Sequence, residues 1–331
     1  MIKILFFLSY ITSLLFTPNL FSTNLFASED YPKQPINLIV GFGVGGSSDR
    51  LARAMAPFLS KDLNTPIVIM NKVGEGSKIA ASYVLKQPAD GYTIFATTFT
   101  PYLANTILME GATYHIEDFD YINIQWYDND IVAVNNESPF HSLTELLELI
   151  KNGETKIKVA VMENSSGHLL LKFLLKSYAI PDENIELHLF NSGKKARDAI
   201  IQKEIDMIII SSEGSELIRE HLRTLAVFSE ERHPKWDVPT VNEAVLPLGF
   251  QVPFFIGSMR GFAVSAKLKR DYPKRYAKIV QSLIKILARK EVQRILRTEK
   301  IGGVWTGPKK SNALVKDTFL MYQQNAHLLR K

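Results

Sequence analysis

The sequence predicts an α/β protein of two lobes, each built on a mostly parallel sheet with helices on both faces. Short β-branched runs alternate with helical stretches, and this alternation is typical of parallel sheets covered on both sides. The chain of 331 residues is long for one such domain. No internal repeat and no long flexible linker interrupts it, which favours a clamshell whose chain passes between lobes through short extended crossings.

Nine runs predict strands, and they are 36–40, 67–70, 93–97, 131–134, 157–161, 185–189, 207–210, 225–228 and 262–264. Helical patterns fall between most of them, at 49–63, 78–86, 143–151, 168–178 and 194–203. Apolar residues at helical spacing predict a further helix over 271–289, with Lys and Arg on its other face. Pro308 opens a last helix toward Leu329. We expect one lobe from residues 28–130 and 235–331, and the other from residues 131–234.

The N-terminal segment indicates export. Lys3 precedes an apolar run from Ile4 to Phe16, and Ala27 stands just before a polar stretch. This pattern predicts a secretory signal over residues 1–27, cleaved after Ala27, and a periplasmic protein. An uncleaved membrane anchor is the alternative, although the run is short for a bilayer span.

The composition excludes several chemistries. The chain has no cysteine, so disulfides, thiolate metal sites, a cysteine nucleophile and a lipoprotein anchor are excluded. Its seven histidines follow no metal-ligating pattern, and we expect neither a metal nor a cofactor. The formal net charge of +5 suits acidic small molecules or an anionic membrane surface. An exported protein without basic runs interleaved with aromatics is not expected to bind nucleic acid.

The most informative motif is a glycine-rich turn between the first predicted strand and a helix that begins near Ser47. Backbone N–H groups and the positive end of a helix dipole meet there, which is a ready site for an anion. Gly41, Gly43 and Gly46 spell G-x-G-x-x-G, but the second strand ends in Asn71-Lys72 without the acidic residue that holds a ribose. A P-loop lysine and a nucleophile-elbow glycine are also missing. A purely structural turn remains the alternative.

Two later turns repeat this logic. Ser165 and Ser166 precede a helix that begins near His168, and Asn191-Ser192-Gly193 follows another strand. Three strand-to-helix turns from two lobes can therefore converge on one anion, which backbone amides bind strongly when water is excluded. In the first turn, Asp49 is expected to stabilise the helix dipole and the loop amides more than to contact the ligand.

Several segments together resemble a known family. Tyr31-Pro32, Pro35 and the turn through Gly45-Gly46 to Asp49 are similar to the start of a mature tripartite tricarboxylate transporter substrate-binding protein, of the Bug receptor family. The similarity continues, in order and over nearly the whole mature chain, through Ala89-Asp90-Gly91-Tyr92-Thr93, Ser165-Ser166-Gly167-His168, Leu225-Ala226-Val227 and Val238-Pro239-Thr240.

This resemblance implies a periplasmic binding protein of type II-like clamshell fold. It would close on a small carboxylate, of which di- or tricarboxylates are the expected kind, and hand it to integral membrane permease subunits. A non-catalytic monomer is expected. The ligand-binding residues that the resemblance implies are Phe42, Gly45, Gly46, Ser47, Asp49, Thr97, Thr98, Thr100, Ser165, Ser166, Gly167, His168, Asn191, Ser192 and Gly193.

The chain departs from the family pattern over residues 254–266 and around Ile210, where Ser211 and Ser212 follow. Arg260, in the first of these stretches, is either a second carboxylate-binding group or a surface ion-pair partner. Two other functions remain open. One is a secreted hydrolase that uses the same cleft, with His168 as its base, and the other is a receptor that senses its ligand for a membrane signalling partner.

Overall fold

The computed structural model describes residues 30–329, of which residues 31–329 belong to one compact unit. The predicted signal segment 1–27, with its cleavage after Ala27, lies outside the described residues. Across residues 30–329, no helix combines the length and the apolar character needed to cross a membrane.

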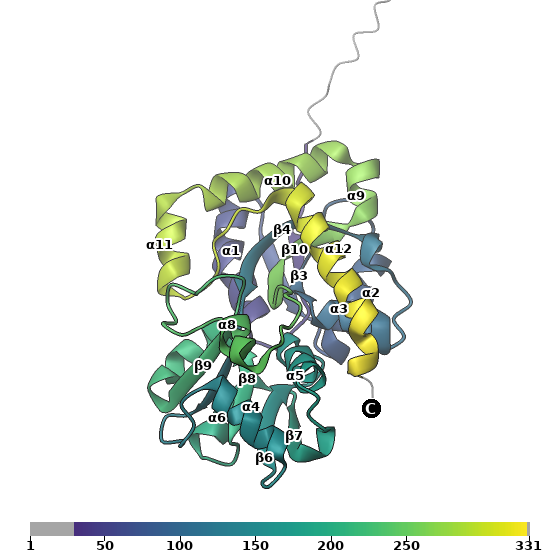
Figure 1. The fold of residues 1–331 in the computed structure, drawn as a ribbon. Coiled ribbons are helices and arrows are strands. Elements are labelled where there is room, and N and C mark those ends of the chain that lie inside the picture. Colours follow the sequence, from purple (N-terminus) through teal and green to yellow (C-terminus); the bar gives the residue numbers. More distant parts are fainter. Residues whose placement is uncertain (1–29, 330–331) are drawn as a thin grey trace, which may run out of the picture. The chain divides into compact units, whose positions relative to one another are not determined.

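The first sheet has the strand order β2-β1-β3-β10-β4 (Figure 1). β10 runs antiparallel to both of its neighbours, and the other pairings are parallel. The strands are β1 (Ile36–Val40), β2 (Ile67–Asn71), β3 (Thr93–Thr100), β4 (Phe119–Asp128) and β10 (Ser258–Ser265). One apolar cluster packs α1 (Ser47–Leu63), α10 (Pro273–Leu287) and α11 (Lys290–Thr298) on one face. Another packs α2 (Lys78–Lys86), α3 (Tyr102–Met109) and α12 (Gly307–Asn325) on the other.

The second sheet repeats this plan with the order β7-β6-β8-β5-β9, in which β5 is antiparallel to both neighbours. Its strands are β5 (Asp130–Asn135), β6 (Ile157–Met162), β7 (Ile185–Phe190), β8 (Met207–Ser211) and β9 (Leu222–Phe228). α4 (Leu143–Asn152), α5 (Ser166–Ser177) and α8 (Val241–Val245) share one apolar cluster, and α6 (Gly193–Ile201) belongs to the other. The predicted pair of mostly parallel, helix-covered sheets is confirmed.

Short elements complete the described chain. Two brief helices, α7 (Ser212–Ser215) and α9 (Ala266–Asp271), follow β8 and β10. The 3₁₀ turns are η1 (Glu75–Ser77), η2 (Ile116–Asp118), η3 (Asp182–Asn184), η4 (Glu216–His221), η5 (Leu246–Leu248) and η6 (Ala326–Leu328). The helix expected over 271–289 is α10, which Tyr272 separates from α9.

The chain crosses between the sheets at two adjacent points. β4 ends at Asp128 and β5 begins at Asp130, so one residue makes the first crossing. A Cβ on Gly257, just before β10, would lie 2.2 Å from the carbonyl oxygen of Asp128, so the two crossings touch and glycine is required there. Residues 235–331 were expected in the first lobe, yet α8 packs against α4 and β9. We therefore propose that the lobes divide at residue 129 and at Gly257.

Candidate functional site

The β1–α1 turn is built as the glycine pattern indicates. A Cβ on Gly41 would lie 1.8 Å from Ser77 Oγ, and Gly45 has a φ of +81°, so neither position accepts a side chain easily. Gly46 is the N-cap of α1, and its own N–H donates to the carbonyl oxygen of Gly43. The first intrahelical hydrogen bond of α1 runs from Arg50 N to the carbonyl oxygen of Gly46. The amides of the opening helical residues, from Ser47 on, thus lack an intrahelical acceptor.

Asp49 braces this turn from inside. One carboxylate oxygen accepts hydrogen bonds from Gly45 N and Arg53 Nε, each at 2.8 Å, and the other accepts from Asn71 Nδ2 at 2.8 Å. Burial alone would raise the pKa of Asp49, but the hydrogen bonds from Arg53, Asn71 and Gly45 outweigh it and hold the pKa below its usual range. The carboxylate is therefore fully used in ordering the turn, which is the structural role expected of it. Asn71 also donates to Phe42 O.

The threonines expected after the third strand lie within it, because β3 extends to Thr100. Thr97 Oγ1 is 2.7 Å from Ser77 Oγ, and Thr98 Oγ1 is 3.1 Å from Ser48 Oγ. The Thr98 contact ties the start of α1 to the sheet, and the Thr97 contact ties η1 to it; both threonines are at most 2% exposed. Thr100 is buried, and its hydroxyl oxygen has no partner among the described residues.

In the second sheet, the turn before α5 is tightly packed. Ser165 is the N-cap of α5, and its Oγ accepts a hydrogen bond from His168 N at 3.1 Å. A Cβ on Gly167 would lie 2.6 Å from the carbonyl oxygen of Ile209, so this glycine lets α5 approach β8. Ser166 and His168 are buried at 1% and 4% exposure.

The turn before α6 is more open. Asn191 is exposed, Ser192 is the N-cap of α6, and Gly193 begins the helix. A Cβ on Gly193 would lie 2.8 Å from Arg197 Nη1. The guanidinium of Arg197 thus folds back over the start of its own helix.

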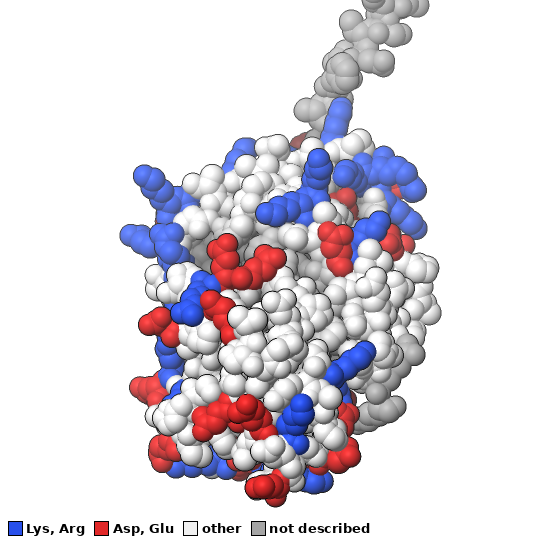
Figure 2. Space-filling view, in the orientation of Figure 1, with Lys and Arg blue, Asp and Glu red and all other residues white. Residues whose placement is uncertain are grey.

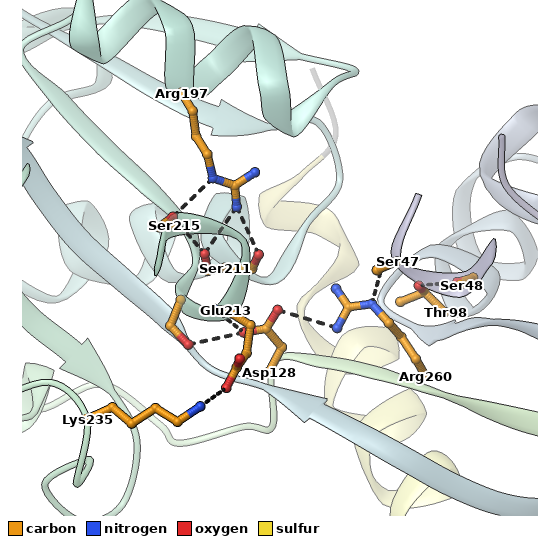
Figure 3. Close-up of polar contacts among 11 residues, drawn as sticks. Ser47, Ser48, Thr98, Asp128, Arg197, Ser211, Glu213, Ser215, Lys235 and Arg260 are labelled. Carbon is orange, nitrogen blue, oxygen red and sulfur yellow. Dashed lines mark hydrogen bonds and ion pairs between the residues drawn. The ribbon is translucent and has the colours of Figure 1, made fainter. Parts of the chain in front are cut away.

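A chain of polar contacts joins the two sheets (Figure 3). Arg260, on β10, donates from Nε to Ser47 Oγ at 2.7 Å, and its Nη1 lies 3.4 Å from Asp128 Oδ2. The other oxygen of Asp128 accepts from Ser212 Oγ and from Glu213 N, each at 3.2 Å, at the start of α7. We call this chain the interlobe seam. Arg260 is 6% exposed, so it is a buried partner of Asp128 and not a surface ion-pair partner.

Arg197 enters the same region from the opposite side, as Figure 3 shows. Its Nε donates to Ser215 Oγ at 3.1 Å, and its Nη2 donates to the carbonyl and hydroxyl oxygens of Ser211, each at 3.2 Å. All of these acceptors are neutral, and among the described ion pairs none includes Arg197. Burial lowers the pKa of this guanidinium, and Arg260 lowers it further against the opposing effect of Asp128. A largely desolvated cation with no carboxylate in hydrogen-bond contact is the arrangement that an anionic ligand completes.

Two more ionisable groups belong to the seam. Burial raises the pKa of Asp130 to about 7, the nearby Asp128 adds to the shift, and Ser166 and Arg260 oppose it. Asp130 Oδ2 is buried and accepts no hydrogen bond from the described residues. Burial likewise raises the pKa of Tyr102 to about 12. The ring of Tyr102 packs edge-on against Phe42, with centroids 5.5 Å apart.

Two hollows of the described residues lie elsewhere. One of about 270 Å³ is lined by Lys86, Tyr114 and Lys267, among others, and one of about 520 Å³ by Ile107, His115 and Phe319, among others. None of the predicted ligand-binding residues lines either hollow. Within residues 30–329, no group of three or more His, Asp or Glu side chains is placed to hold a metal ion.

Of the expected site residues, the structure connects Ser47 directly to Arg260 and sets Ser166 next to Asp130. Sequence reasoning missed Tyr102, Asp128, Asp130 and Arg197. A signal for two of them was the polar run from Asp128 to Asp130 between two apolar strands, which marks a crossing. For Arg197 the signal was its spacing of four from Gly193, which places it over the helix start.

Comparisons with known proteins agree with the resemblance seen in the sequence. A family model described as the tripartite tricarboxylate transporter family receptor matches residues 51–270. BugT of Bordetella pertussis is 28% identical over 239 residues, which is 69% of this chain and 71% of BugT. R. palustris Rpa4515, solved with adipate, superposes with a TM-score of 0.72 at 23% identity, over 90% or more of each chain. MatC from Rhodopseudomonas palustris, solved with bound malate, gives 0.69 at 21% identity and covers 91% of this chain and 100% of MatC.

Proposed function

Because the chain belongs to the receptor family of the tripartite tricarboxylate transporters, we propose that it is an exported receptor that reversibly binds a small carboxylate between its two sheets. It hands this ligand to membrane-embedded transporter subunits and acts as a monomer, without catalysis. The signal-like segment 1–27 directs it to the periplasm. Adipate and malate, the ligands named for two similar structures, are small dicarboxylates and support this ligand class.

The observation that carries the proposal is that Arg197 has no carboxylate among its described hydrogen-bond acceptors. Its neighbours Ser211 and Ser215 supply only neutral acceptors, and keeping a guanidinium away from water without a counterion is costly. A ligand carboxylate would remove that cost and form a charge-assisted hydrogen bond with Nη1, which has no described acceptor. Across the seam, the amides at the start of α1 and the guanidinium of Arg260 would bind the same ligand from the first sheet.

Ligand access requires the seam to open. Ser48, Thr97, Thr98, Ser166 and His168 are at most 4% exposed in this structure, which leaves no passage to them from solvent. The crossings at Asn129 and Gly257 touch, so a small rotation about this pair of short crossings would separate the sheets. A ligand that contacts both sides then favours the closed state by those contacts.

The hydrolase alternative has less support. A nucleophilic serine needs its hydroxyl against the base, whereas Ser165 Oγ accepts a hydrogen bond from the backbone N–H of His168 and caps α5. A sensing role uses the same site and differs only in the partner. Neighbouring genes that encode a permease would favour transport, and genes for a membrane kinase would favour sensing.

A thermal-shift screen of residues 28–331 tests the proposal. The panel holds small mono-, di- and tricarboxylic acids, with neutral sugars and amides as controls. A ligand that binds only the folded state raises the melting temperature by mass action, by an amount that grows with its concentration. We expect one or a few acids to raise it and the neutral compounds to leave it unchanged. A rise with neutral compounds alone would contradict the carboxylate assignment.

A further inference from the structure

A strongly basic surface covers one end of the molecule. Between Ala266 and Lys300 the chain has twelve Lys or Arg residues and three Asp or Glu residues. This segment forms α9, α10 and α11. α9 and α10 lie at the end of the first sheet away from the second sheet, and α11 turns back along one side of the first sheet (Figure 1). We call it the basic face. Figure 2 shows its Lys and Arg side chains projecting in groups along the upper edge of the molecule. Its exposed members are Lys267, Lys269, Arg270, Lys274, Lys278, Lys285, Lys290, Arg294, Arg297 and Lys300.

The opposite end of the molecule carries the other sign of charge. Residues 130–257, which form the second sheet and its helices, contain nineteen Asp or Glu residues and thirteen Lys or Arg residues. The molecule is therefore an electric dipole whose positive end is the basic face. An anionic surface would attract the basic face and repel the second sheet, which fixes one orientation.

The apolar sides of these helices are already used. Ile279, Leu283 and Ile286 of α10 are at most 1% exposed, and Val292 and Leu296 of α11 are fully buried. Of the large apolar side chains described as exposed, Tyr272 alone belongs to this segment. The basic face therefore has no apolar side to insert into a bilayer. It also lacks the apolar centre that is typical of a protein–protein interface.

The described chain begins on this same face. Tyr31 is the first residue of the compact unit, and its carbonyl oxygen accepts a hydrogen bond from Lys278 Nζ on α10. Arg275, one turn earlier, lies 5.4 Å from the centre of the Tyr31 ring. The first described residues therefore lie against the basic face.

We propose that the basic face docks the protein on an anionic phospholipid surface by charge alone, with the second sheet directed away from the membrane. Lys and Arg side chains near an anionic leaflet are attracted without inserting, and this attraction decays within a Debye length of about 10 Å at 0.1 M salt. Binding should therefore be reversible and strongly salt-dependent. Such docking would keep the receptor near its membrane partner while leaving the seam free to open.

The test is co-sedimentation of residues 28–331 with two kinds of phospholipid vesicle. One is pure phosphatidylcholine, which is neutral. The other mixes phosphatidylcholine and phosphatidylglycerol at a ratio of about 3:1, which gives the anionic surface that the proposal needs. The basic-face variant combines Lys285→Gln, Lys290→Gln, Arg294→Gln and Arg297→Gln, none of which has a described side-chain partner. The matched control combines Lys156→Gln, Lys158→Gln, Lys176→Gln and Lys195→Gln, which are exposed on the second sheet's side and change the net charge equally. Melting temperatures verify that both variants fold.

We expect wild type and control to bind the anionic vesicles at low salt. The affinity of the basic-face variant for these vesicles should be lower by at least about tenfold. Binding should vanish for all three on neutral vesicles and at high salt. An equal loss in the control would overturn the proposal, because net charge and not this face would then decide binding. No binding of wild type to anionic vesicles would also overturn it, and would point to an acidic protein as the partner of the basic face.

Discussion

Asp130 is the seam residue whose ionisation is most perturbed. Its Oδ2 is buried without a partner, and burial raises its pKa to about 7 from 3.8. Between these two pH values the folded protein holds a proton that the unfolded chain has lost. The free energy of unfolding therefore falls as pH rises through this window, and the loss is complete above pH 7. A carboxylate ligand nearby would bind best when Asp130 is neutral.

We predict that Asp130→Asn makes the protein more stable than wild type at pH 8, by about 4 kcal/mol for a shift of this size. The variant should also lose most of the pH dependence of stability between pH 4 and pH 7. Urea unfolding at several pH values measures both effects. Asp237→Asn, at an exposed position without a described partner, is the control and should change neither. An unchanged pH slope in Asp130→Asn would show that another group titrates in this window.

Among the helices and strands, close contacts at glycine residues determine where the helices lie. In each of the three candidate turns, a glycine stands where a Cβ atom would clash with a neighbouring backbone atom or side chain. Gly167 is the clearest case, because the nearest atom to its Cβ position is a backbone oxygen of β8, which cannot move like a flexible side chain. The position of α5, and with it that of Ser166, depends on this contact.

We predict that Gly167→Ala destabilises the protein by about 1–3 kcal/mol, the usual cost of forcing extra volume into a packed contact. Gly43→Ala is the matched control, because nothing lies within 4 Å of its Cβ position and its φ is not positive. That change should cost little or even stabilise, since it restricts the unfolded chain. Chemical denaturation of both variants makes the comparison. Equal stability of the two would mean that α5 can shift away from β8 at no cost.

The elements that the sequence predicts well have regular apolar periodicity. β4 was missed because its buried positions include Asn123 and Gln125, which are fully buried and donate to carbonyl oxygens of Val304 and Gly302. These long-range partners are invisible in a local pattern. α3, α8 and α11 were also missed. α3 follows a strand directly through Pro101, which leaves no turn signal between them.

The candidate site likewise has parts that local sequence patterns predict and parts that depend on long-range contacts. The glycine turn, the bracing role of Asp49 and the cap at Ser165 follow from local rules and could be predicted. The seam could not, because Asp128, Arg197 and Arg260 lie far apart in the sequence and meet only through the fold. In α6 only the spacing of four from Gly193 distinguishes Arg197 from the exposed Lys194 and Lys195.

At the scale of the whole molecule, the two sheets are joined by two touching crossings and by the interlobe seam. Arg260 is satisfied within the seam by Asp128 and Ser47, whereas Arg197 faces it with neutral partners only. We propose that a ligand carboxylate binds at Arg197, where this imbalance lies. This proposal requires Arg197 to contribute to affinity and not to stability.

Isothermal titration calorimetry tests the role of Arg197. The acid that gives the largest thermal shift is titrated into wild type, into Arg197→Met and into the control Arg294→Met. Arg294 is exposed on α11. Arg197→Met should bind the acid about 10- to 100-fold more weakly, as the loss of hydrogen bonds to a charged group predicts, with an undiminished melting temperature because a desolvated charge is removed. Arg294→Met should bind as wild type does. Unchanged affinity in Arg197→Met would show that the ligand binds elsewhere and not at Arg197.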